Sequence, residues 1–221
     1  MKHIKPGLVE ALGSFFLAVI VGLTGGNALA VGLLIAGLVY AGAYISGAHY
    51  NGALSFASLI RGLLDKKEVI GYWAWQIVGA ALGFVVVYQL IGVDFVLPVN
   101  PELNWYGVIA IEFLLTFAFA WIWLSILSAL PYEGNQIFGL VIGLTLAAIV
   151  FLGGMYNPTL ALGSMIVGLI KGTLTKNLIW WYLAAFVLAP LAGAAAAGYV
   201  TNYLNKDEEE ELVFVEEETI E

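Results

Sequence analysis

The sequence predicts an all-α membrane protein with six apolar helices and two half-length apolar helices, arranged as an inverted repeat. Composition supports the membrane class, because 62% of the 221 residues are hydrophobic and only 11% are charged, against roughly a quarter in soluble domains. Internal symmetry supports the repeat, because the motif SGAHYNGALSFASL at 46–59 has a counterpart in GGMYNPTLALGSMIV at 153–167. Each motif continues for about ten apolar residues, half of the roughly twenty that cross a bilayer.

Hydropathy predicts the elements of a first repeat over residues 1–92. These are spans at 7–24 and 28–46, a half-helix at 51–61 and a third span at 70–91. The apolar run from Leu8 imitates a signal peptide, but it contains Glu10 and lacks a small-residue cleavage site, so we interpret it as a retained first helix. Gly79 and Gly83 form a small-residue face that lets the third span approach a neighbouring helix closely.

The same order of elements recurs over residues 105–205, after an external linker at 93–104. The second repeat has spans at 105–128, 136–152 and 179–204, and a half-helix at 157–168. Each repeat opens with a helix that carries one acid, and 102 positions separate Glu10 from Glu112, against 106 between the two motif asparagines. Because each repeat has three spans, the second enters the membrane inverted, and the two half-helices meet near the midplane. This arrangement predicts a transport site where the repeats meet.

Charge in the short loops predicts the orientation of a multi-pass protein in the cell membrane. Six basic residues fall on the side of the termini and two on the other side, which places both termini in the cytoplasm. Residues 206–221 hold nine of the sixteen acidic residues, so we interpret them as a disordered acidic tail; a partner-binding tail is the alternative. The absence of a basic patch argues against nucleic acid as a partner. With no Cys and only His3 and His49, we expect neither a metal site nor a cofactor.

The two motifs resemble those of a known family. SGAHYNGA and GGMYNPTLALG are similar to the paired Asn-Pro-Ala motifs of the major intrinsic proteins, the aquaporin and aquaglyceroporin family. The family's E-x-x-G-[ST]-F and Q-x-x-G-A patterns are matched at 10–15 and 76–80. The resemblance covers residues 7–204. It implies an aquaporin-like bundle, assembled as a homotetramer in the lipid bilayer, that conducts water and/or small uncharged solutes such as glycerol, ammonia or dissolved gases.

The motif residues have a physical reason to line a pore. Two half-helices that begin at mid-membrane aim the positive ends of their dipoles at one point. Asn51 and Asn157 can cap these helices and also direct an amide N–H into the lumen, where it donates to a passing oxygen. We expect the pore motifs to comprise Asn51, Gly52, Ala53, Asn157, Pro158 and Thr159. Glu10 and Glu112 are expected to anchor the loops before the two asparagines, at 46–50 and 153–156. The alternatives are a polar contact between packed helices and a proton relay.

Several positions depart from the family pattern. Gly52 stands where the family has Pro, Thr159 where it has Ala, and Leu160 where it has the Arg of the outer filter. The resemblance places the selectivity filter at Val31, Val150, Gly154 and Leu160, an apolar set without fixed charge. An apolar constriction favours apolar or weakly polar solutes, so we expect selectivity to shift from water toward small neutral solutes. His49 is expected at the vestibule, either as a functional residue or as an ordinary hydrogen-bonded loop residue.

Three other classes of function compete with a channel. A non-conducting structural or adhesion protein of the same fold is the main alternative, because the filter Arg is missing. An intramembrane enzyme is disfavoured, since no nucleophile–base pair or metal-ligand set is present. A coupled transporter would need an ion site or a proton relay, and Glu10 and Glu112 are the only ionisable residues in the spans.

Overall fold

The computed structural model describes residues 4–92, 104–128, 134, 136–174 and 176–206. Within these residues every regular element is helical. The helices are α1 (Ile4–Thr24), α2 (Ala28–Ser46), α3 (Gly52–Arg61), α4 (Lys66–Ile91), α5 (Trp105–Ser128), α6 (Phe138–Val150), α7 (Pro158–Lys171), α8 (Lys176–Leu183), the π-helical turn η2 (Ala184–Leu188) and α9 (Ala189–Leu204). The predicted linker at 93–104 and the predicted tail at 206–221 lie outside the described residues, apart from Asn104 and Lys206.

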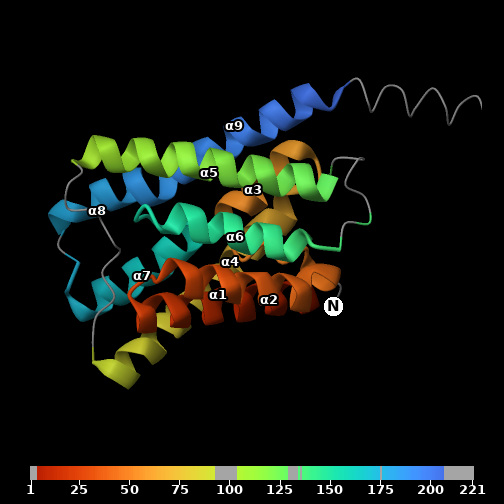
Figure 1. Cartoon of the computed structure of the whole chain (residues 1–221). Helices are drawn as coiled ribbons and strands as arrows, with labels where there is room; N and C mark the ends of the chain where they lie inside the picture. Colours follow the sequence, from red (N-terminus) through yellow and green to blue (C-terminus); the bar gives the residue numbers. More distant parts are fainter. Residues whose placement is uncertain (1–3, 93–103, 129–133, 135, 175, 207–221) are drawn as a thin grey trace, which may run out of the picture.

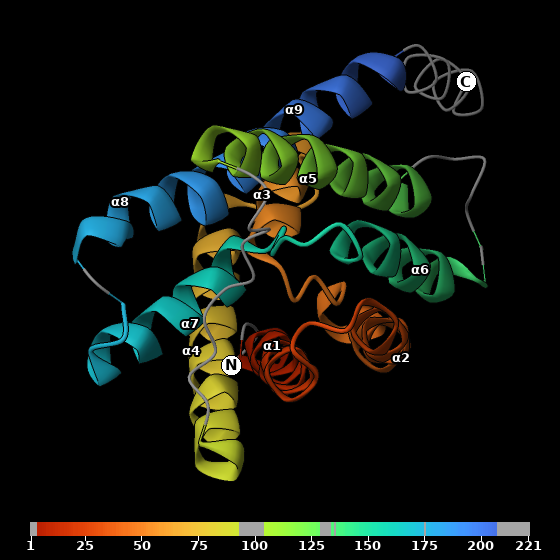
Figure 2. The same cartoon turned by 60° about the vertical axis from the view of Figure 1, so that its left-hand side comes forward.

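The arrangement is an inverted repeat of six membrane helices with two half-helices between them (Figures 1 and 2). In the first repeat α1 packs on α4, and in the second α5 packs on α9 in the same way. The half-helices are exchanged between repeats, because α3 packs on α9 and α7 packs on α4. Figure 1 shows the start of α1 and the end of α9 on one side of the bundle, which we call the termini side. Each half-helix begins deep in the protein, because its first residues are buried.

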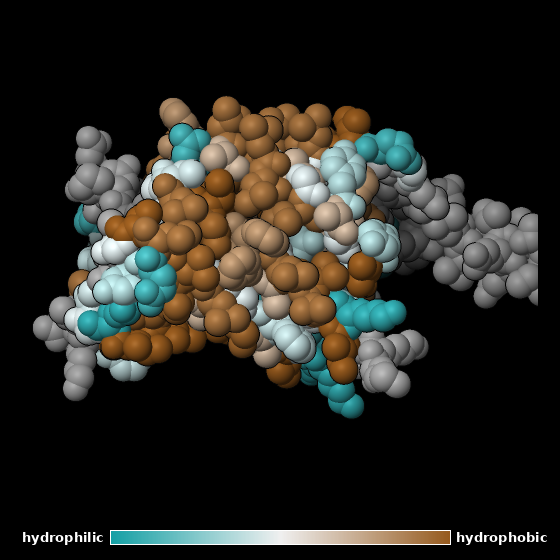
Figure 3. Space-filling view, turned by 90° about the horizontal axis from the view of Figure 1, so that it is seen from below, coloured by the Kyte–Doolittle hydropathy of each residue, from teal (hydrophilic) through white to brown (hydrophobic). Residues whose placement is uncertain are grey.

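Five helical segments are long and apolar enough to cross a membrane among the described residues. They are α1, α2, α4, most of α5, and the continuous stretch Leu178–Leu204. The sixth, α6, has only 13 residues and is shorter than the predicted span at 136–152, because turns occupy both of its ends. One face of the molecule shows a broad apolar band with hydrophilic residues toward either end (Figure 3), as expected for a surface in contact with lipid tails.

Two helix boundaries differ from the hydropathy prediction for local reasons. Helix α4 begins at Lys66 rather than 70, because Asp65 and Glu68 form a capping box that satisfies the first backbone donors. The last span is interrupted by the π-helical turn η2, two residues before Pro190. Proline has no backbone N–H and its ring displaces the carbonyl four residues earlier, so the hydrogen-bond ladder shifts at this point. A hydropathy average detects neither effect.

Glycines make the close helix crossings that their spacing predicts. Gly79 and Gly83 on α4 face the backbone carbonyls of Ala11 and Phe15 on α1, and an added Cβ would collide with them. In the second repeat Gly193 on α9 faces the backbone of α5 in the same manner. Without side chains between them, helix backbones approach closely and gain packing contacts that lipid does not supply. These crossings hold the scaffold around the half-helices.

Candidate functional site

The two half-helices begin at a pair of asparagines with matching geometry. The Asn51 Oδ1 accepts from the Ala53 N–H at 2.8 Å and caps α3, while the Asn157 Oδ1 accepts from the Leu160 N–H at 3.1 Å and caps α7. Both asparagines are in extended backbone conformation, as helix N-caps usually are. Each side-chain oxygen is therefore committed to its own helix, which orients the amide nitrogen away from it.

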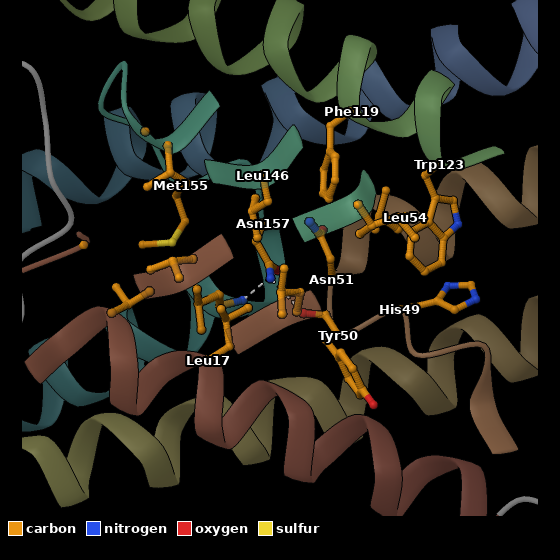
Figure 4. A pocket seen from close by; sticks show the side chains of 18 of the residues that line it. Leu17, His49, Tyr50, Asn51, Leu54, Phe119, Trp123, Leu146, Met155 and Asn157 are labelled. Atoms are coloured by element: carbon orange, nitrogen blue, oxygen red, sulfur yellow. Dashed lines mark hydrogen bonds between the residues drawn. The ribbon is translucent and has the colours of Figure 1, made fainter. Parts of the chain in front are cut away.

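The amide nitrogens tie the two loops to each other. The Asn51 Nδ2 donates to the Tyr156 carbonyl at 2.8 Å, and the Asn157 Nδ2 donates to the Tyr50 carbonyl at 2.8 Å. An amide nitrogen carries two N–H groups, so each asparagine keeps a second N–H beyond this reciprocal bond. Both side chains line the same cavity, and Figure 4 shows them side by side near its middle. Two convergent donors are thus available to a molecule in the cavity.

Two buried carboxylates hold the loops that precede the asparagines. The carboxylate of Glu10 accepts from the His49 N–H at 3.0 Å and the Tyr50 N–H at 2.6 Å. The carboxylate of Glu112 accepts from the Met155 N–H at 2.6 Å and the Tyr156 N–H at 2.8 Å. These bonds matter because Tyr50 and Tyr156 have φ values of 49° and 51°, in the left-handed region that non-glycine residues rarely adopt. The carboxylates satisfy backbone donors that a regular helix would otherwise pair.

Glu10 has a larger set of partners than Glu112. It also accepts from the Ser46 hydroxyl at 2.7 Å and from the Gln76 Nε2 at 2.7 Å. The Oε1 of Gln76 accepts in turn from the Thr159 hydroxyl at 3.0 Å. The first loop is thus joined through Gln76 on α4 to the first turn of α7, which couples the two half-helices through buried polar side chains.

Gly52 and Thr159, two departures from the family pattern, are in direct contact. The Gly52 N–H donates to the Thr159 Oγ1 at 3.1 Å. A Cβ at position 52 would lie 2.6 Å from the Thr159 Cγ2 and 3.2 Å from the Pro158 Cγ. A proline at 52 would have no N–H to satisfy, whereas glycine leaves one that needs an acceptor. Thr159 supplies the acceptor and fills the space that a proline ring would take.

A cavity of about 140 Å³ runs past the asparagines. Helices α1, α2, α5 and α6, the first turns of the half-helices and the two loops supply its walls; the lining residues are Leu17, Val21, Gly25, Gly26, Val31, Ile35, Ala48, His49, Tyr50, Asn51, Leu54, Phe119, Trp123, Ile142, Leu146, Val150, Gly153, Gly154, Met155, Asn157 and Leu160. None of these is Lys or Arg. Lys171, at the far end of α7, lies with its Nζ 3.3 Å from the centre of the Tyr88 ring and does not line the cavity.

The structure brings most of the predicted site residues together. The two asparagines, His49 and the four expected filter residues, Val31, Val150, Gly154 and Leu160, all line the cavity. The other motif residues, Gly52, Ala53, Pro158 and Thr159, are buried in the first turns of the half-helices and do not line it. Glu10 and Glu112 lie behind the loops, with no exposed surface. Among the described residues no group of three or more His, Asp or Glu side chains could hold a metal ion.

Sequence reasoning missed several cavity walls. One face of α5 and one face of α1 line the cavity. The residues on these faces are Phe119 and Trp123 on α5, and Leu17 and Val21 on α1. The signal was present, because each pair is four residues apart, so both members share a helix face. Moreover, the 102-position offset between Glu10 and Glu112 also relates Leu17 to Phe119 and Val21 to Trp123. The spacing and the offset group these four residues, but only the packing of α1 and α5 shows that their shared faces turn toward the cavity.

The chain is similar to known proteins over most of its length. A model of the family described as "Major intrinsic protein" matches residues 7–201. The "Glycerol uptake facilitator protein-like 6" of Lactiplantibacillus plantarum is 30% identical over 226 residues, which cover 91% of this chain and 98% of that protein. The X-ray structure of the aquaglyceroporin from Plasmodium falciparum superposes with a TM-score of 0.77 and 25% identity, over 89% of this chain and 94% of the other.

Proposed function

This chain belongs to the major intrinsic protein family, and on that premise we propose that it is a passive membrane channel for water and small uncharged solutes. The reciprocal asparagine pair carries the proposal, because it leaves two amide N–H groups available to the cavity that both residues line. The name of the relative from Lactiplantibacillus plantarum, which assigns glycerol uptake to that protein, makes glycerol the first solute to test. Ammonia and dissolved gases are further candidates.

The proposed mechanism is transient hydrogen bonding without a fixed charge. A solute oxygen at the centre of the cavity accepts from Asn51 and Asn157, which compensates part of its lost hydration. The positive ends of the two half-helix dipoles meet at the same place, so a cation experiences an unfavourable electrostatic potential there. Since a neutral hydroxyl gains the hydrogen bonds and a cation pays the electrostatic cost, the centre of the cavity favours neutral solutes.

We assign supporting roles to the remaining motif residues. Glu10 and Glu112 anchor the strained loops, so that the carbonyls and amides near each asparagine keep their orientation. Gly52 and Ala53, with Pro158 and Thr159, shape the first turns of the half-helices and set the distance between them. His49 belongs to the vestibule on the termini side.

The filter on the opposite side is proposed to be apolar, with Val31, Val150, Gly154 and Leu160 as its members. Their positions in the cavity wall support this assignment. A water molecule that passes these residues gains no hydrogen bond from a side chain, so its entry costs more than in a filter that contains Arg. We therefore expect a lower preference for water over larger neutral solutes.

The proposed setting is a homotetramer in the lipid bilayer of the cell membrane, with both termini in the cytoplasm. The apolar surface supports the lipid contact. Three of the basic residues that argued for this orientation, Arg61, Lys66 and Lys67, lie at the end of α3 and the start of α4, which agrees with their assignment to one short loop.

The test is stopped-flow measurement of solute flux into proteoliposomes. Purified protein is reconstituted, and the permeabilities to water, glycerol and ammonia are compared with those of empty liposomes from the same lipid. Faster passage of at least one neutral solute, without a rise in proton or potassium conductance, is the expected result. If no solute crosses faster than in empty liposomes, the channel proposal is wrong and the non-conducting alternative is favoured.

A further inference from the structure

The two ends of the cavity differ, although the repeat makes their frameworks equivalent. The 106-position offset relates Leu54 to Leu160 and His49 to Met155. Leucine therefore stands both at the filter Arg position, 160, and at its equivalent in the first repeat, 54. On the opposite side, the cavity is lined by the aliphatic residues Leu17 and Val21 of α1 and by Met155. Their counterparts on the termini side are Phe119, Trp123 and His49. Polar and aromatic side chains are therefore concentrated at one end.

Two polar atoms at this end have no partner. The Nε1 of Trp123 and the Nδ1 of His49 are both buried and make no hydrogen bond in the structure. Trp123 is 1% exposed and His49 is 7% exposed, and both line the cavity. The ring centres are 5.4 Å apart, and Figure 4 shows the two side chains together at the end of the cavity farthest from Met155. Buried polar groups are rarely left unpaired, so a pair on a cavity wall calls for a partner inside it.

The neighbours hold the pair in place without satisfying it. The His49 ring packs edge-on against Tyr72 at 5.4 Å between ring centres. The Tyr72 hydroxyl is already used, because it donates to the Ser46 carbonyl at 2.8 Å. The His49 backbone N–H is held by Glu10 at 3.0 Å. The imidazole is thus positioned by packing and by its backbone, and its Nδ1 stays free for another group.

We propose that His49, Trp123 and Phe119 form a second solute-binding station, selective for neutral molecules that carry a hydroxyl group, such as polyols. The proposal rests on the proposed channel function. It places the main selection among neutral solutes on the termini side of the cavity, and not at the apolar outer filter. A hydroxyl oxygen accepts from the Trp123 Nε1–H, and its own hydrogen is donated to the His49 Nδ1 when the imidazole carries its proton on Nε2. The Phe119 ring offers an apolar wall to the carbon backbone of the solute. A dissolved gas forms neither bond and gains nothing from this station.

The test uses Trp123→Phe, which keeps an aromatic ring and removes the N–H. Losing one hydrogen bond at this station predicts a fall in glycerol permeability of about fivefold to tenfold. Trp181→Phe is the matched control, because that indole stacks on Trp105 at 5.8 Å and does not line the cavity. If Trp123 were only a steric plug, the smaller ring would widen the passage and glycerol flux would rise. The two readings therefore predict opposite signs.

His49→Leu removes the acceptor and provides a second, independent test should Trp123→Phe fail to fold. A similar loss of glycerol flux is expected. In the double variant the combined loss should be smaller than the product of the two single losses, because both groups bind the same hydroxyl. Measured on proteoliposomes with equal amounts of folded protein, unchanged or increased flux in the variants overturns the station and leaves the channel intact. Absence of flux in the unaltered protein overturns the channel, and with it the station.

Discussion

The contact between Gly52 and Thr159 predicts that the two residues are energetically coupled. Gly52→Pro restores the family residue at the first position of α3 but removes the N–H that donates to the Thr159 Oγ1. It also adds ring atoms where a Cβ alone would lie 2.6 Å from the Thr159 Cγ2. Overpacking of a tight interior costs about 1–3 kcal/mol, and a lost hydrogen bond costs about 1 kcal/mol. The stiffer unfolded chain returns only about 0.4–1 kcal/mol, so the single variant is destabilised.

Thr159→Ala is also expected to destabilise the protein, for a different reason. It leaves the Gly52 N–H buried without an acceptor, at a cost of about 1–3 kcal/mol. In the double variant the clash and the unpaired N–H both disappear, because alanine makes room for the ring and proline has no N–H. The hydrogen bond from the Thr159 hydroxyl to the Gln76 Oε1 is lost in Thr159→Ala and in the double variant alike, so it cancels from the comparison. The free energy lost by the double variant should therefore be at least about 1 kcal/mol smaller than the sum of the two single losses.

The assay is thermal unfolding of the detergent-solubilised protein, followed by helical circular dichroism. For a protein of this size, about 1 kcal/mol corresponds to about 2–4 °C in the melting temperature. Gly52→Pro combined with Thr201→Ala is the control pair. The hydroxyl of the buried Thr201 donates to the Ala197 carbonyl on its own helix, so the effect of Thr201→Ala should add to that of Gly52→Pro. Strict additivity of Gly52→Pro and Thr159→Ala would refute the coupling.

Three further outcomes are expected. Glu10→Gln should lower the melting temperature more than Glu112→Gln in the same thermal assay. The reason is that Glu10 accepts four hydrogen bonds and Glu112 accepts two. An equal or reversed order of the two melting temperatures would contradict the anchoring role. Asn157→Asp should reduce neutral-solute flux and raise cation conductance in proteoliposomes. The substitution replaces an amide that donates to the Tyr50 carbonyl and to solutes in the lumen by a negative charge. Unchanged flux and conductance would argue against Asn157 as a pore donor. Leu160→Arg should raise the ratio of water to glycerol permeability, and an unchanged ratio would show that position 160 does not set the filter.

The membrane helices were predictable because hydropathy is a property of local sequence. Spans of about twenty apolar residues are long enough to cross the hydrocarbon by themselves, so their existence depends little on their neighbours. The half-helices were predictable for a related reason. The capping asparagine marks the start of a helix, and the apolar run that follows it is too short to span the bilayer. The errors lay at local details that hydropathy averages over: the capping box of Asp65 and Glu68, the short α6, and the turn before Pro190.

The sequence by itself determined the class of protein, the inverted repeat, the two asparagine motifs and the apolar character of residues 31, 150, 154 and 160. Only the tertiary structure decided which helix faces line the cavity, because the rotation of each helix follows from its packing against the others rather than from its own hydropathy. For that reason Phe119 and Trp123 were overlooked, as was the contact between Gly52 and Thr159. Two residues 107 positions apart become partners only when two half-helices from opposite repeats are brought end to end.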